Sequence, residues 1–84
     1  MKVLIVEDEI RIREGLEKLL GKLRPEYEIV GRAENGAEGL ALCKSEQPDI
    51  ILTDVKMPRM DGLKMLTAIY DAGIRTKAIV LSAY

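Results

Sequence analysis

Three carboxylate side chains stand directly behind two short apolar runs of the chain. Glu7 and Asp8 follow the run VLIV, and Asp54 follows the run IILT. Apolar runs of this length are typical of strands buried on both faces of a parallel sheet. Because parallel strands point their carboxyl ends toward the same edge, we expect the three acids to meet there. Clustered carboxylates repel one another, and a hard cation such as Mg²⁺ relieves that repulsion.

The bulk composition excludes several classes of function. The 84 residues allow one small domain, and the absence of Phe and Trp requires an aliphatic core. A net charge of -1 argues against nucleic-acid binding by this chain. With no His and only Cys43, zinc sites, His-based catalysis and an internal disulfide are excluded, which fits a reducing cytoplasm. We find no apolar run long enough to cross a membrane and no secretory leader.

The elements that must position the acids follow from the apolar pattern, which predicts an α/β fold. Strands are expected at residues 2–6, 27–33, 49–53 and 77–82, and helices at about 9–23, 35–45 and 61–73. Asn35 followed by Glu38 resembles a capping box, Asp61 is a plausible N-cap, and Gly73 can close the third helix in a left-handed conformation. Each helix would cross between parallel strands in the right-handed sense.

Two patterns predict which side chains face the core. In the first helix, five residues form one apolar stripe that we expect to be buried: Ile12, Leu16, Leu19, Leu20 and Leu23. The second strand alternates and so predicts an edge strand, with Tyr27, Ile29 and Ala33 on one face and Glu28 and Arg32 on the other. We expect Met57, Met60, Thr53 and Cys43 to be packing residues.

The chain resembles the receiver domain of bacterial two-component response regulators. The acidic pair, Asp54, the string MPRMDG at 57–62 and the string LSA at 81–83 carry this resemblance. It implies a flavodoxin-like, doubly wound parallel sheet with strand order 2-1-3-4-5. In that order the switch point lies between strands one and three, where the acids are expected.

The resemblance also implies a role for each site residue. Asp54 would be the nucleophilic phosphoacceptor, and Ser82 would be the hydroxyl that contacts the phosphoryl group. Mg²⁺ would bind Asp8 directly, Glu7 through water, Asp54, and the backbone carbonyl of Lys56. Blander interpretations remain: Asp54 as a turn cap, the acidic pair as a partner of the helix dipole, and Ser82 as a turn former.

The resemblance implies further that residues 1–84 are the N-terminal part of a receiver. Receivers have a fifth strand and two more helices, with a lysine after that strand, and these do not occur in the 84 residues. The apolar fourth strand, at 77–82, is then expected to present a bare edge. A homodimer that pairs through this edge, by addition or by domain swapping, and a partly ordered monomer are both open outcomes.

The leading functional prediction is a signalling module rather than an enzyme. It would take a phosphoryl group from a sensor histidine kinase onto Asp54 with Mg²⁺ and control an output domain absent from this chain. The ends of the chain look most like receivers of helix-turn-helix transcription regulators. One alternative is an excised or engineered fragment that self-assembles without signalling. A less favoured alternative is a haloacid-dehalogenase-like phosphohydrolase, whose second Asp is replaced here by Lys56.

Overall fold

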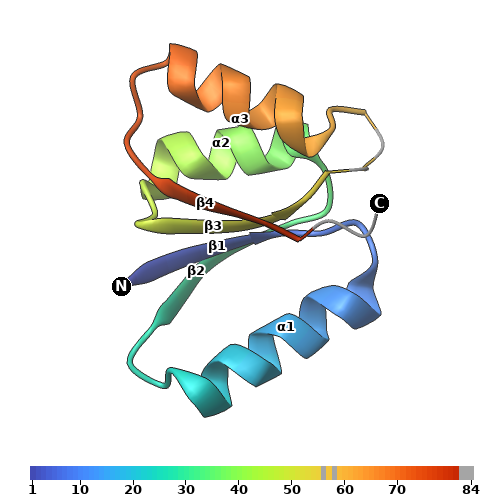
Figure 1. Cartoon of the computed structure of the whole chain (residues 1–84), viewed down its shortest axis with the longest axis vertical. Helices are drawn as coiled ribbons and strands as arrows, with labels where there is room; N and C mark the ends of the chain where they lie inside the picture. The colour runs from blue at the N-terminus through green and yellow to red at the C-terminus, as the bar shows by residue number, and fades with distance from the viewer. Residues whose placement is uncertain (56, 58, 82–84) are drawn as a thin grey trace.

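The computed structural model describes residues 1–55, 57 and 59–81, and these form four strands that alternate with three helices (Figure 1). The elements are β1 (Lys2–Val6), α1 (Ile10–Leu23), β2 (Glu28–Ala33), α2 (Gly36–Glu46), β3 (Ile50–Asp54), α3 (Gly62–Asp71) and β4 (Lys77–Leu81). The predicted element order is therefore confirmed, with boundaries that shift by one or two residues. None of the described helices is long and apolar enough to cross a membrane.

The four strands form one parallel sheet in the order β2-β1-β3-β4. Figure 1 shows α1 alone on one face of the sheet and α2 and α3 together on the other. The crossover after β1 therefore runs over one face of the sheet, and the crossovers after β2 and β3 run over the other. This arrangement confirms the doubly wound fold and places its switch point between β1 and β3.

The main core lies between the sheet and the α2–α3 layer. Leu4 and Val6 of β1, Ile51 of β3, and Met65 and Ile69 of α3 are all at most 2% exposed there. Burial of one such aliphatic side chain stabilises the fold by roughly 1.5–3 kcal/mol. The core holds the two central strands rigidly, so the residues at their carboxyl ends have fixed positions.

The apolar stripe of α1 is much less buried than its spacing predicts. Leu16 and Leu20 pack against Val3 and Ile5 on the sheet. Ile12, Leu19 and Leu23 are 45%, 52% and 67% exposed, and no residue of α1 is fully buried. The expectation of a wholly buried stripe was wrong because α1 is the only described helix on its face, so one flank of the stripe has no neighbour.

A β-bulge interrupts the alternation of β2. Val3 of β1 pairs with Ile29, whereas the next residue, Leu4, pairs with Gly31. Val30 is therefore an extra residue opposite this pair, and the side chains beyond it change faces. The prediction that β2 is an edge strand is confirmed by the strand order.

The bulge overturns the predicted faces of β2. Ile29 packs toward α1, but Ala33 lies in the core on the opposite side. Arg32 points toward α1, where its guanidinium pairs with the Glu17 carboxylate. Ile29 and Ala33 were expected on one face and Arg32 on the other. One inserted residue inverts this because side chains alternate with a period of two.

The predicted capping residues are confirmed, although the Glu38 carboxylate accepts from the Glu34 N–H (3.2 Å) and not from the Asn35 N–H as in a full capping box. Asn35 Oδ1 accepts a hydrogen bond from the Glu38 N–H (2.9 Å), and Asp61 Oδ1 accepts one from the Lys64 N–H (2.8 Å). Beyond α3, Gly73 adopts φ +75° and its N–H donates to the carbonyl of Tyr70 (3.0 Å). These bonds satisfy terminal backbone groups and fix where α2 and α3 begin and where α3 ends.

Strand β4 forms the edge of the described sheet opposite β2. It pairs only with β3 among the described strands, and Ile79 and Val80 are 49% and 41% exposed. The expected apolar edge is therefore present. Burial of this strand on both faces, which its apolar sequence indicates, is not found within the described residues.

Candidate functional site

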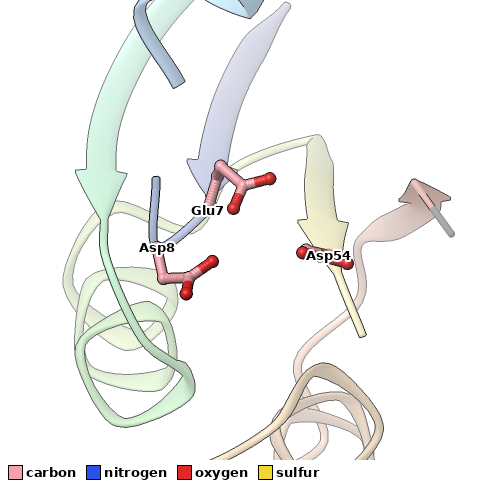
Figure 2. A group of neighbouring side chains, drawn as sticks. All are labelled: Glu7, Asp8 and Asp54. Atoms are coloured by element: carbon pink, nitrogen blue, oxygen red, sulfur yellow. The ribbon is translucent and has the colours of Figure 1, made fainter. Parts of the chain in front are cut away.

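The three acids predicted from the sequence converge at one edge of the sheet. Glu7 and Asp8 follow β1, and Asp54 is the last residue of β3. One carboxylate oxygen from each lies within 4.8 Å of the others. Figure 2 shows the three side chains grouped beside the ends of the two strands. The switch point therefore carries a cluster of oxygen ligands, as the sequence predicts.

The environments of the three carboxylates differ. Glu7 is only 4% exposed, Asp54 is partly buried, and Asp8 is exposed. Burial raises the pKa of Glu7, and the hydrogen bond with Asp8 and the negative charge of Asp54 raise it further. The N–H of Glu9, which donates to Glu7 Oε2 (3.2 Å), opposes this rise. The negative charge of Glu7 is therefore poorly solvated and lies next to two further carboxylates.

This donor set fits Mg²⁺. The ion prefers carboxylate and carbonyl oxygen ligands and usually keeps several waters, which the exposed side of Asp8 allows. Soft or borderline metals favour thiolate and imidazole, and neither occurs at the described cluster. Glu7, Asp8 and Asp54 are the residues that would hold the ion.

Asp54 is held by hydrogen bonds from both of its neighbours in the chain. The Val55 N–H donates to Asp54 Oδ1 (2.7 Å), and the Thr53 hydroxyl donates to the Asp54 carbonyl (2.8 Å). Gly62 packs against this segment, since a Cβ built on it would lie 2.2 Å from the Asp54 carbonyl oxygen. Only a residue without a side chain fits this close backbone approach, and Gly62 thereby fixes the loop that follows the site.

Arg13 is a residue of the site that the sequence reasoning missed. Its Nη1 donates a hydrogen bond to the backbone carbonyl of Glu7 at 2.6 Å, from the first turn of α1. A basic residue on an amphipathic helix gives no signal of such a contact by itself. The sequence therefore does not predict this contact, because its acceptor is a backbone atom.

The other sequence-based expectations fall into two groups. Met57 and Met60 pack against the main core, and Thr53 and Cys43 are fully buried, so their packing roles are confirmed. Burial also raises the pKa of the Cys43 thiol. Lys56 and Ser82 lie outside the described residues, and their roles in holding the metal and contacting the phosphoryl group stay predictions.

Comparison with known proteins decides the family. Residues 3–84 match the family model of the response regulator receiver domain. The chain belongs to this family. Receiver domains act in two-component signalling and generally bind Mg²⁺ at an acidic pocket, and this structure has an acidic cluster of Glu7, Asp8 and Asp54.

The receiver domain is similar to the receivers of several transcription regulators. The transcriptional regulatory protein YdfI of Bacillus subtilis is 45% identical over 83 residues, which are 99% of this chain and 38% of YdfI. The nitrate/nitrite response regulator protein NarL of Escherichia coli K12 is 34% identical over 80 residues, 95% of this chain and 37% of NarL. The chain therefore spans less than half of these relatives.

A solved structure gives the same result for the fold. The DNA-binding response regulator of the LuxR family from Staphylococcus aureus superposes with a TM-score of 0.90 at 28% identity. The match covers 99% of this chain and 68% of that chain. Receivers of transcriptional regulators work with histidine kinases and an output domain, so the role of this family is signalling rather than catalysis.

Proposed function

We propose that this receiver domain accepts a phosphoryl group on Asp54 from the phosphohistidine of a sensor kinase. The observation that supports this most directly is the convergence of Asp54 with Glu7 and Asp8 at the switch point of the sheet. The competing interpretation of Asp54 as a simple turn cap accounts for its bond from the Val55 N–H. It does not account for two further carboxylates within 4.8 Å.

The proposed step is a displacement at phosphorus. A carboxylate oxygen of Asp54 forms a bond to phosphorus while the bond from phosphorus to the donor imidazole nitrogen breaks. The electron pair of that bond stays on the nitrogen, and the product is an acyl phosphate. Mg²⁺ would be held by Glu7, Asp8, Asp54 and the backbone carbonyl of Lys56, and Ser82 would contact the phosphoryl oxygens. When bound, the ion supplies positive charge that offsets the phosphoryl charge as Asp54 approaches.

The packing around Asp54 supports a role as nucleophile. The Thr53 hydroxyl donates to the Asp54 carbonyl, Gly62 packs against that carbonyl, and the Val55 N–H donates to the Asp54 carboxylate. A nucleophile held in this way loses little conformational freedom when it attacks, which lowers the entropic part of the barrier. The partial exposure of the side chain leaves it open to a donor from outside.

Phosphorylation of the chain by a small phosphodonor, such as acetyl phosphate, tests the proposal. We expect the wild-type chain with Mg²⁺ to gain one phosphoryl group by intact-mass spectrometry, and Asp54→Asn to gain none. Asp71→Asn, which removes an exposed acid at the end of α3, is the matched control and should label normally. Labelling of Asp54→Asn at the wild-type rate, or labelling unaffected by EDTA, contradicts the proposal.

The same chain can be tested against the phosphohydrolase alternative. Such an enzyme needs a general acid beside its nucleophile, and Lys56 stands at the position where a second Asp is expected. We expect negligible turnover of p-nitrophenyl phosphate. Turnover that Asp54→Asn abolishes and Asp71→Asn preserves would favour the phosphohydrolase instead.

The relatives support a proposal for the partners of the whole protein. YdfI and NarL are regulators that extend well beyond the matched segment. We infer a full protein in which phosphorylation of Asp54 controls a DNA-binding output domain in the cytoplasm. This chain, with a net charge of -1, would not itself bind the nucleic acid.

A further inference from the structure

Arg13 binds the β1–α1 loop at two points. Its backbone N–H donates to the carbonyl of Glu9 (2.9 Å), which starts α1. Its guanidinium reaches back and donates from Nη1 to the carbonyl of Glu7 (2.6 Å). The loop between these carbonyls carries both Glu7 and Asp8, so one residue fixes the segment that supplies two of the three clustered carboxylates.

Other contacts hold the same loop from the sheet side. The Glu7 N–H donates to the carbonyl of Ala33 on β2 (2.9 Å), and the Glu9 N–H donates to Glu7 Oε2 (3.2 Å). Arg13 therefore completes a set of bonds that leaves the main chain of Glu7 satisfied at both its N–H and its carbonyl. Loss of the guanidinium frees the carbonyl and loosens the connection to the helix.

The guanidinium contacts the backbone of the loop and does not pair with its carboxylates. Within the described residues, Arg13 forms no ion pair with an acid at 4.0 Å or less. Glu7, Asp8 and Asp54 thus keep oxygens available for a cation. An arginine that served only to neutralise the cluster would pair with a carboxylate, usually through two bonds.

We infer that Arg13 is a positioning residue for the divalent cation. It fixes the β1–α1 loop through the Glu7 carbonyl and so positions the carboxylates that would bind the ion. The inference rests on the proposed function, in which Mg²⁺ binds this cluster. Groups that orient metal ligands from outside typically change metal affinity by roughly 10-fold to 100-fold when they are removed. Arg13 would act on the affinity for the ion and only through it on phosphorylation.

Charge and positioning predict opposite results for removal of Arg13. A positive charge near the cluster repels a cation, so its loss by charge alone would strengthen binding. Loss of the positioning contact would weaken binding, because the carboxylates would have to be ordered by the ion itself. The direction of the change therefore distinguishes the two effects.

Isothermal titration calorimetry with Mg²⁺ on the full chain measures this direction. We expect Arg13→Met to bind roughly 10-fold more weakly than wild type. Arg13→Lys should also bind more weakly, since it keeps the charge but has a shorter reach. Arg11→Met removes the same charge from an exposed position on the same helix and should bind as wild type does. Thermal unfolding in EDTA checks that the variants fold alike.

A measurement on the wild-type chain covers the case in which the variants do not fold. The Arg13 Nη1–H signals in an NMR spectrum should exchange slowly, because Nη1 donates to the Glu7 carbonyl, and they should shift when Mg²⁺ is added, whereas the corresponding Arg11 signals should do neither. A rapidly exchanging Arg13 signal that ignores Mg²⁺ overturns the inference. So does an Arg13→Met variant that binds Mg²⁺ as tightly as wild type, or more tightly.

The proposed function and this inference fail in different ways. A wild-type chain that binds Mg²⁺ and labels at Asp54, with no effect of Arg13, overturns the inference and leaves the proposed function intact. A wild-type chain that binds no Mg²⁺ overturns both.

Discussion

At the scale of single residues, Gly62 shows how a residue with no functional group controls the site. Its N–H donates to the carbonyl of Val55 (2.8 Å), which folds the loop back after Asp54. A Cβ at this position would lie 2.2 Å from the Asp54 carbonyl oxygen and 3.1 Å from the Val55 Cα. Both obstacles are backbone atoms, which cannot move aside without moving Asp54 itself.

Substitution of this residue is expected to be costly. Gly62→Ala should lower the free energy of unfolding by roughly 1–3 kcal/mol through overpacking. Gly21→Ala is the matched control, since a Cβ there meets nothing within 4 Å in the interior of α1. It should raise stability by about 0.5–1 kcal/mol. Urea denaturation measures both changes, and a Gly62→Ala variant as stable as wild type contradicts the close approach.

Residue types and strand ends were sufficient to predict the acid cluster but not its supporting contacts. Glu7, Asp8 and Asp54 could be predicted together because parallel strands end at one edge. The bond from Arg13 to the Glu7 carbonyl could not, because its acceptor is a backbone atom and carries no sequence signal. Supporting contacts of this kind depend on how α1 packs against β1, and the residue types alone do not determine that packing.

At the scale of elements, local sequence signals predicted the helix ends well, whereas the strand register and the burial of α1 could not be predicted from the sequence. Asn35, Asp61 and Gly73 mark helix ends through bonds within a few residues, so the sequence contains them. The bulge at Val30 depends on the register of β2 against β1, which the alternation of β2 alone does not specify. The exposure of the α1 stripe likewise depends on which elements share its face of the sheet.

An ion pair joins α1 to β2 as a consequence of this bulge. The Arg32 guanidinium donates through Nε and Nη2 to the two carboxylate oxygens of Glu17. The hydrogen bond with Arg32 lowers the pKa of Glu17, and the same bond raises the pKa of Arg32. Both side chains are partly exposed, so solvent weakens the pair, and a contribution of about 0.2–1 kcal/mol is expected.

The pair predicts a pH dependence with a definite sign. Because the pKa of Glu17 is lower in the folded chain than its ordinary value of 4.5, the pair stabilises the fold above that pH. Its contribution is lost as the pH falls through the lowered pKa. A double-mutant cycle with Glu17→Gln and Arg32→Gln should show coupling at pH 7 that vanishes at strongly acid pH. The cycle cancels effects from Glu7, and coupling that persists in acid contradicts the prediction.

At the scale of the whole molecule, the two faces of the sheet are covered unequally. Among the described elements, α2 and α3 cover one face and α1 covers the other (Figure 1). Ile79 of β4 pairs in register with Leu52, so its side chain points to the face that carries α1. Apolar surface at an unpaired strand edge favours pairing with another chain. The described residues therefore combine a well-packed site with an exposed apolar edge at β4.

The arrangement that we consider pairs the β4 strands of two copies in antiparallel fashion, with Ile79 of one copy opposite Ile79 of the other. It would place Lys77 opposite Leu81 of the second copy, so no like charges would face each other. We predict that light scattering gives the 84-residue chain a molar mass above that of one copy, rising with concentration. Ile79→Lys should return it to one copy, because a lysine on an edge strand opposes pairing.

Leu63→Lys is the matched control for this prediction, since Leu63 is similarly exposed at 59% but lies at the start of α3. It should leave association unchanged, because the charge is added away from the strand edge. A wild-type chain with the mass of one copy at all concentrations contradicts edge pairing. Equal effects of the two substitutions would instead assign the association to general apolar surface, because only pairing through β4 requires the change to lie on that strand.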